Sequence, residues 1–249
     1  MSNPDHVAHA PRSGRVLVSL GAIAAVLVLI LTALGVWQLQ RLCWKLDLIQ
    51  RTEAMLAADP VPAPDPESWD RITRADEYRR LRVAGRYLHG RDTLVQAVTD
   101  LGPGFWVMTP LRTDAGWTLL VNRGFVPADR RAPDDRSLPE GPQQVTGLLR
   151  PSQPGGAFLR RNDPADGRWY SRDTAAIAAA QGLGPVAPYF LDRAGVPDPD
   201  DLPIPGLTVV GFRNSHLTYA LTWFTMAIGL AVAVVVIGRR EWRLRRALR

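Results

Sequence analysis

The sequence predicts a membrane protein in which two transmembrane helices, one at each end of the chain, flank a small antiparallel β-sheet or barrel-like domain with one helix. Two long apolar runs near the ends of the chain contain no charged residue. Arginines gather beside these runs, in the terminal tails. Between the runs, short segments with a hydrophobic period of two are separated by turn residues, which is typical of strands. The fold class is therefore membrane α with an extracytoplasmic α+β domain.

The first predicted transmembrane helix covers residues 16–39 and follows a cytoplasmic tail at residues 1–15. Its apolar run reaches the roughly 20 residues that a helix needs to cross a bilayer. A cleaved signal peptide is the alternative, but its apolar core is usually about 7–15 residues long and ends at a small-x-small site. No such site ends this run, so we expect an anchor that is retained. Apolar residues continue at helical spacing as far as Leu56, and Asp59-Pro60 is expected to end the helix at Ala58.

The second predicted transmembrane helix covers residues 215–238 and is followed by an Arg-rich tail at residues 239–249. The two tails hold 8 of the 30 basic and 2 of the 24 acidic residues, so the rest of the chain holds 22 of each and is neutral. Basic flanks of membrane helices favour the cytoplasmic side. We therefore expect both termini in the cytoplasm and a β-rich domain, residues 40–214, outside it. A neutral outer domain argues against nucleic acid as a partner.

The expected location is the cytoplasmic (inner) membrane of a bacterium, with the central domain in the periplasm. The N-terminal tail contains Asp5, whereas mitochondrial presequences are poor in acidic residues. The single cysteine, Cys43, excludes an internal disulfide, a paired-cysteine redox site and a zinc site built from cysteines. We interpret Cys43 as a small apolar side chain rather than as a reactive thiol.

The central domain is expected to begin with a stiff, proline-rich connector at residues 60–66 and to continue as short strands. Residues 79–87 alternate apolar and polar side chains. Residues 105–111 and 118–126 are expected to form a hairpin around Asp114-Ala115-Gly116. The other candidate strands are residues 93–98, 144–149, 188–192 and 207–212. These patterns do not predict the order of the strands in the sheet.

One helix is predicted in this domain, over the alanine-rich residues 173–181. Asp173 is placed to cap its first turn, and Gly182 is placed to end it. Residues 195–206 contain four prolines and three aspartates, which predicts a surface loop.

The sequence contains no motif of an enzyme active site, so we expect no catalytic residues and no enzymatic activity. The predicted outer domain has a single histidine, His89, so a zinc site built from it would lack a second imidazole ligand. There is no G-x-S-x-G elbow, Walker loop or dinucleotide-binding glycine pattern. Acidic residues are scattered along the chain, and nothing selects a pair of them for acid–base chemistry.

Polar and aromatic residues gather at the outer ends of the two predicted spans. On the second helix, His216, Tyr219 and Trp223 recur at i, i+3 and i+7, and therefore share one face. At the same expected depth, the first helix carries Trp37, Gln38, Arg41 and Trp44.

Two interpretations of this cluster stay open on residue chemistry alone. Aromatic and basic side chains gather at membrane interfaces without any specific role. An ionisable residue such as His216 is more often functional there. As a neutral imidazole, His216 is a candidate axial ligand of a haem iron, and Arg41 or Arg213 is then a candidate partner of a propionate.

Four segments resemble the surfeit locus protein 1 family, whose members are assembly factors for cytochrome c oxidase. Residues 34–45 (LGVWQLQRLCWK) resemble the N-terminal signature of that family. Residues 77–87 (EYRRLRVAGRY) are similar to its Tyr-Arg…Val-x-Gly strand, and residues 121–127 (VNRGFVP) to its N-R-G-[FW]-V-P motif. Residues 213–223 (RNSHLTYALTW) resemble its C-terminal signature. The matches occur in order, with the two-span layout of the family.

The resemblance implies a role in maturing the catalytic subunit of a haem–copper oxidase, with haem a as a transient cofactor. His216 is then the expected ligand of the haem iron. The other residues expected to bind haem a are Tyr219, Trp223, Arg41, Trp37 and Gln38. The expected partners are the oxidase catalytic subunit, haem a synthase and membrane lipid.

Two alternatives to the haem carrier stay open. In the first alternative, the chain is a haem-independent scaffold that stabilises an oxidase assembly intermediate, and His216 is a structural residue. The second alternative, an enzyme acting on haem or lipid, is disfavoured, because no activated nucleophile or cluster of bases is present.

The motif Asn122-Arg123-Gly124 is expected at a strand end or in a turn. It either contacts the oxidase subunit or holds a tight turn.

Overall fold

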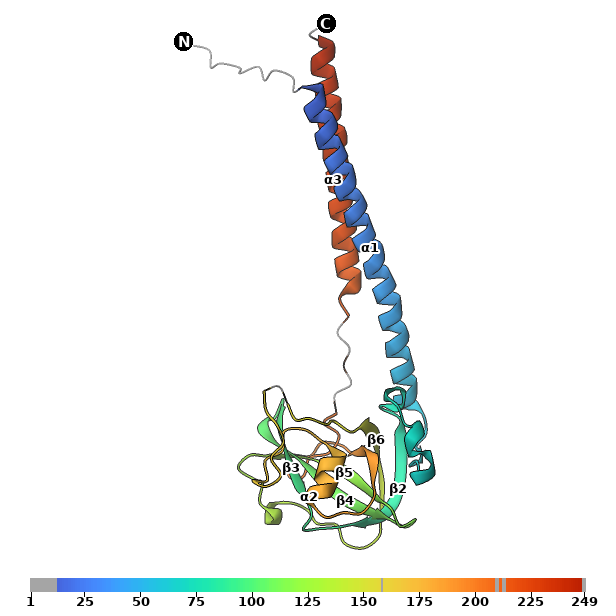
Figure 1. The fold of residues 1–249 in the computed structure, drawn as a ribbon, viewed down its shortest axis with the longest axis vertical. Coiled ribbons are helices and arrows are strands. Elements are labelled where there is room, and N and C mark those ends of the chain that lie inside the picture. Colours follow the sequence, from blue (N-terminus) through green and yellow to red (C-terminus); the bar gives the residue numbers. More distant parts are fainter. Residues whose placement is uncertain (1–12, 158, 209–210, 212–213, 248–249) are drawn as a thin grey trace. The chain divides into compact units, whose positions relative to one another are not determined.

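The computed structural model describes residues 13–157, 159–208, 211 and 214–247. The chain divides into two compact units, a helix pair (residues up to 50 and from 211) and a β-domain (residues 51–210). Figure 1 shows the elements of both units. The predicted fold class, two long apolar helices that flank a β-rich domain with a helix, is confirmed.

The helix pair consists of α1 (Gly14–Ala57) and α3 (His216–Ala247). Both helices are long and apolar enough to cross a membrane. α1 ends one residue before the predicted Ala58, at the Asp59-Pro60 stop. α3 continues as a helix through most of the Arg-rich tail, which the sequence did not indicate.

α1 and α3 run antiparallel, side by side (Figure 1). A Cβ atom on Gly35 would lie 2.6 Å from Cε1 of Phe224, and one on Gly14 would lie 3.7 Å from Nη1 of Arg245. The buried and half-buried residues of α1 recur at alternating intervals of three and four, which is the repeat of paired helices. They include Gly21, Ala24, Val28, Leu31, Gly35, Gln38 and Leu42.

The described part of the β-domain contains seven strands. They are β1 (Val61–Pro62), β2 (Arg80–Tyr87), β3 (Thr93–Thr99), β4 (Gly102–Thr113), β5 (Thr118–Pro127), β6 (Gln143–Pro151) and β7 (Val186–Arg193). The sheet order is β1-β2-β6-β7-β5-β4-β3, and β2 also pairs with β4. This extra pairing closes β2, β6, β7, β5 and β4 into a barrel, which leaves β1 and β3 as attached strands. The short 3₁₀ helices are Pro66–Arg71, Arg74–Asp76 and Pro133–Asp135.

The sheet is not purely antiparallel. β5 and β7 pair in parallel, and so do β1 and β2. The predicted hairpin around Asp114-Ala115-Gly116 is confirmed as the antiparallel pair β4 and β5. The strand predicted at residues 207–212 is wrong for Leu207 and Thr208, which lie in no strand, and most of the rest lies outside the described residues. The proline-rich connector contributes β1 to the sheet.

The single predicted helix of the domain is α2 (Thr174–Ala180). The Asp173 carboxylate accepts a hydrogen bond of 3.1 Å from the Ala176 amide, and Gly182 follows the helix with φ +60°, as expected for a cap and a stop. α2 buries Ile177 against an apolar cluster on the outer face of the barrel.

The predicted surface loop at residues 195–206 is only half exposed. Its first part is exposed, but Leu202 and Ile204 are each only 2% exposed. Ile204 exchanges backbone hydrogen bonds of 2.8 and 2.9 Å with Phe125. Apolar side chains among the prolines therefore pack this segment against β5.

β5 lies at the centre of the domain, because both of its faces are covered. Every residue of β5 except the last is buried. Its inward side chains join the apolar interior of the barrel, whereas Leu120 packs under α2 and Phe125 packs against Ile204. The interior consists of Leu81, Val83, Tyr87, Leu111, Trp117, Leu119, Val121, Val145, Leu149, Ala187, Tyr189 and Leu191.

Candidate functional site

The helix pair brings His216 and Gln38 into direct contact. The Nδ1 atom of His216 lies 2.7 Å from Oε1 of Gln38. His216 is the first residue of α3. The side-chain oxygen of Asn214, two residues before it, accepts a hydrogen bond of 3.4 Å from the His216 amide. Gln38 lies on the face of α1 that packs against α3, three residues after the close approach at Gly35. The contact is therefore set by the register of the two helices.

The partner atom determines the tautomer of the imidazole. An amide oxygen only accepts hydrogen bonds, so Nδ1 of His216 donates to Gln38. In the neutral ring the lone pair then lies on Nε2, which has no hydrogen-bond partner among the described residues. An imidazole held in this way has one nitrogen ready to bind a metal ion or to accept a proton.

The other predicted site residues are near His216 or Gln38 in the sequence, but they do not take part in this hydrogen bond. Tyr219 is 54% exposed and Trp37 is 52% exposed, so both project from the sides of the helix pair. Trp223 is half-buried, on the face of α3 that contains the buried Ala220. The structure therefore joins His216 to Gln38 and leaves the large rings beside the pair.

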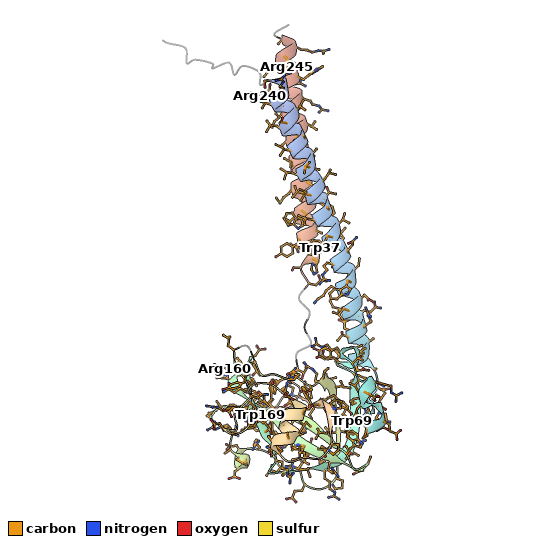
Figure 2. All side chains as sticks on the ribbon, in the orientation of Figure 1. Trp37, Trp69, Arg160, Trp169, Arg240 and Arg245 are labelled. Carbon is orange, nitrogen blue, oxygen red and sulfur yellow. The ribbon has the colours of Figure 1, made fainter. Side chains whose placement is uncertain are left out.

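Arg41 lies one turn beyond Gln38 on α1, at an exposed position. Its guanidinium carbon lies 4.3 Å from the ring centroid of Trp44, which is a cation–π contact. Arg213, the second candidate partner of a propionate, lies outside the described residues. Figure 2 shows Arg240 and Arg245 at one end of the helix pair and Trp37 toward the other.

The donor set fits a haem iron better than a metal ion bound by protein alone. Within the described part of the chain, no group of three or more His, Cys, Asp or Glu residues is placed to hold a metal ion. A haem needs fewer protein ligands, because the porphyrin supplies the equatorial nitrogens. His216 offers one neutral nitrogen, and the exposed rings of Trp37 and Tyr219 offer apolar surface. His89 of the barrel is engaged elsewhere, since its Nε2 atom lies 2.9 Å from the Pro139 carbonyl.

The Asn122-Arg123-Gly124 motif lies inside β5, so the expectation of a strand end or turn is wrong. Asn122 is 4% exposed and Arg123 is 0% exposed, and Gly124 is also buried. Side chains that are buried in this way cannot contact an oxidase subunit directly. Packing in the barrel explains Asn122 and Gly124 of the motif.

Each residue of the motif has its own structural role. Asn122 donates to Asp192 on the parallel strand β7 over 2.8 Å, and its side-chain oxygen accepts from the Gly124 amide over 3.2 Å. Gly124 has φ +141°, and a Cβ atom there would lie 2.2 Å from the Ile204 carbonyl oxygen. Only glycine fits this position. Arg123 points into the end of the barrel, where its guanidinium lies over the ring of Tyr87.

Asp192 is a central polar residue that no sequence motif indicated. It is 3% exposed and accepts hydrogen bonds from four side chains. They are Asn122 (2.8 Å), Arg150 (3.2 Å), Arg172 (3.3 Å) and Thr208 (3.0 Å). Burial lowers the pKa of Arg172, and the charge of Asp192 opposes this shift. The donors come from positions far apart in the chain, so no local pattern reveals the network.

Comparison with known proteins places the chain in a family. The sequence profile of the SURF1 family matches residues 25–228, which is most of the chain. Surfeit locus protein 1 of Homo sapiens is 35% identical over 214 residues, which cover 78% of this chain and 69% of the human protein. The Rattus norvegicus protein is 33% identical over 84% of this chain and 71% of its own length. The Takifugu rubripes protein is 32% identical over 77% of this chain and 85% of its own length. The chain therefore belongs to the SURF1 family.

Proposed function

We propose that this chain is an assembly factor for cytochrome c oxidase that binds haem a as cargo, with His216 as the ligand of the iron. Membership of the SURF1 family implies the assembly role. The observation that supports haem binding is the 2.7 Å contact between Nδ1 of His216 and Oε1 of Gln38. It holds the ring in the tautomer that binds a metal through Nε2.

The surroundings of His216 suit a bound porphyrin. Exposed rings, Trp37 and Tyr219, supply apolar contact area beside the contact of the two helices. Arg41 supplies an exposed guanidinium, which pairs well with a carboxylate such as a haem propionate. When bound, the haem supplies an iron with redox activity, and these side chains orient it and release it to its acceptor.

The expected acceptor is the catalytic subunit of a haem–copper oxidase, and haem a synthase is the expected source of the haem. The proposed location is the inner membrane of a bacterium, with both termini in the cytoplasm and the barrel in the periplasm. The Arg-rich end of the helix pair supports this orientation through the positive-inside rule. Reporter fusions after Ala247 and within the exposed turn at Gly90 test it, because they must report opposite sides of the membrane.

The test of haem binding is an absorption spectrum of the full chain, purified in detergent after co-expression with the haem a synthesis enzymes. The parent is expected to show a haem a spectrum, which His216→Ala loses. Thr218→Ala is the matched control, because Thr218 is an exposed residue of the same helix turn. A parent protein without haem, or a His216→Ala variant with the parent spectrum, contradicts the proposal.

The scaffold function is distinguished by a second readout, the oxidase activity of cells that carry the same variants. The carrier function predicts that His216→Ala lowers both the haem content of the chain and the amount of active oxidase. A variant that loses haem but assembles active oxidase at the parent level indicates a scaffold, in which the His216–Gln38 contact only joins the two helices.

A further inference from the structure

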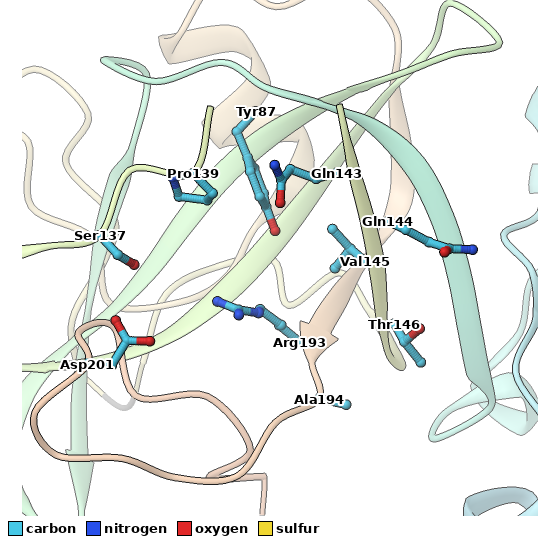
Figure 3. A pocket seen from close by; sticks show the side chains of 10 residues that line it. All are labelled: Tyr87, Ser137, Pro139, Gln143, Gln144, Val145, Thr146, Arg193, Ala194 and Asp201. Carbon is cyan, nitrogen blue, oxygen red and sulfur yellow. The ribbon is translucent and has the colours of Figure 1, made fainter. Parts of the chain in front are cut away.

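The barrel of the β-domain ends in a polar pocket. A cavity of about 440 Å³ opens where β2 and β7 end and β6 begins. Tyr87, Ser137, Gln143 and Arg193 come together around it from separate segments of the chain (Figure 3). Its volume is within the usual range of small-molecule pockets, roughly 300–1,000 Å³. The pocket lies entirely within the β-domain and is separate from the residues that we assign to haem.

A fully buried cation lies directly behind this pocket. Arg123 is 0% exposed, and its guanidinium carbon lies 5.3 Å from the ring centroid of Tyr87. Its Nη2 atom donates to the backbone carbonyl and to the hydroxyl of Ser137. Its Nε and Nη1 atoms have no hydrogen-bond partner among the described residues. Buried charges are normally paired and hydrogen-bonded, so a nearby anion would stabilise the Arg123 guanidinium.

The acidic residues nearby neutralise this cation only in part, because the charge of Asp92 opposes the lowering of the Arg123 pKa without reversing it. The Asp92 carboxylate is engaged by Arg136 at 3.2 Å and by the Thr109 hydroxyl at 2.6 Å. Arg193, in the pocket wall, forms no ion pair with any described residue. Asp201 is the one carboxylate in the wall, and it is exposed. Arg123 and Arg193 therefore leave a net positive charge around the cavity.

We propose that this pocket binds the carboxylate or phosphate group of a small organic anion. Arg193 offers a planar guanidinium that matches the geometry of either group. The hydroxyls of Tyr87 and Ser137 add neutral donors, and Arg123 stabilises the bound charge from behind the Tyr87 ring.

The chemistry of Tyr87 agrees with this role. Burial raises the pKa of Tyr87, so its hydroxyl keeps its proton and remains a donor at neutral pH. Burial also lowers the pKa of Arg123, which reflects a cation that has lost its hydration. An anion in the pocket compensates for that loss. The size of the cavity, larger than a bare ion needs, indicates an organic ligand.

Isothermal titration of the full chain, in a maltoside detergent without phosphate, tests the proposal. The probes are succinate, as a free carboxylate, and glycerol 3-phosphate, as a phosphate that resembles a lipid headgroup. Sodium chloride at equal ionic strength controls for screening. We expect saturable binding of at least one probe. Tighter binding of succinate indicates a free carboxylate as the ligand, and tighter binding of glycerol 3-phosphate indicates a phosphate such as that of a lipid headgroup.

Three variants decide whether the pocket is the binding site. Arg193→Gln is expected to weaken binding about 10-fold or more, because it removes a charged donor. Arg112→Gln, an exposed arginine on β4 outside the pocket wall, is expected to leave binding unchanged. Asp201→Asn is expected to tighten binding severalfold, a result that misfolding cannot produce. The absence of saturable binding by both probes, or equal affinity in Arg193→Gln and the parent, overturns the proposal.

Discussion

Nδ1 of His216 and Oε1 of Gln38 lie 2.7 Å apart, although the two residues are 178 positions apart in the chain. The contact joins the first residue of α3 to the buried face of α1. It fixes both the orientation and the tautomer of the imidazole, as the partners of metal-binding histidines do. The proposed haem site therefore depends on Gln38 as a positioning residue.

Gln38→Leu is expected to retain the haem a spectrum while weakening haem affinity about 10- to 100-fold, because the iron ligand remains but its orientation is lost. Gln38→Glu is expected to retain affinity and to lower the reduction potential of the haem, because a carboxylate makes the imidazole a stronger donor. Haem titration and potentiometry measure the two effects. A Gln38→Leu variant with parental affinity would show that the contact has no role in binding.

Asp192→Asn is expected to destabilise the barrel by about 3–5 kcal/mol, because Arg150 and Arg172 would lose the buried carboxylate that they share. Chemical unfolding of the full chain, followed by tryptophan fluorescence, measures the loss. Asp163→Asn is the control, since its ion pair with Arg168 lies on the surface. An Asp192→Asn variant as stable as this control would show that the network contributes little.

Gly124→Ala is expected to cost more than about 3 kcal/mol or to prevent folding. Alanine is strained at φ +141°, and its Cβ atom would overlap the Ile204 carbonyl. Gly116→Ala separates the two causes, because Gly116 has φ +86° but a Cβ atom there would have no neighbouring atom within 4 Å. The control is expected to lose only about 1 kcal/mol. Equal losses in the two variants would attribute the effect to the backbone angle alone.

The sequence is sufficient to predict the elements whose signals are local. Helix α2 is predictable from its alanines, its Asp173 cap and its Gly182 stop, because all three lie within one segment of the chain. The closure of the barrel by β2 and β4, and the parallel pair β5 and β7, depend on contacts between distant segments. Hydrophobic period does not encode which strands become neighbours.

The same distinction applies to the candidate sites. The sequence singles out both His216 and Gln38 on their own helices, but their contact depends on the helix register. The residues Tyr87, Ser137 and Arg193 of the polar pocket belong to no shared motif, because three separate segments of the chain bring them together. Arg123 belongs to a recognisable motif, yet its burial follows from the central place of β5 in the barrel.

Stability is expected to fall at alkaline pH because of two buried tyrosines. Burial raises the pKa of both Tyr189 and Tyr87 above the ordinary value of 10.0. Above that pH the unfolded chain releases these protons while the folded chain keeps them, so the free energy of unfolding decreases as pH rises. Each tyrosine contributes a slope of up to about 1.4 kcal/mol per pH unit.

Tyr189→Phe tests this dependence. At neutral pH the variant is expected to lose about 1 kcal/mol, because the Tyr189 hydroxyl donates a 2.7 Å hydrogen bond to the Pro64 carbonyl. Above about pH 10 its stability is expected to fall less steeply than that of the parent, so the two curves converge. Urea unfolding at a series of pH values measures both effects, and Tyr87→Phe is expected to reduce the slope in the same way. Parallel curves for Tyr189→Phe and the parent would show that Tyr189 ionises equally in the folded and unfolded chains.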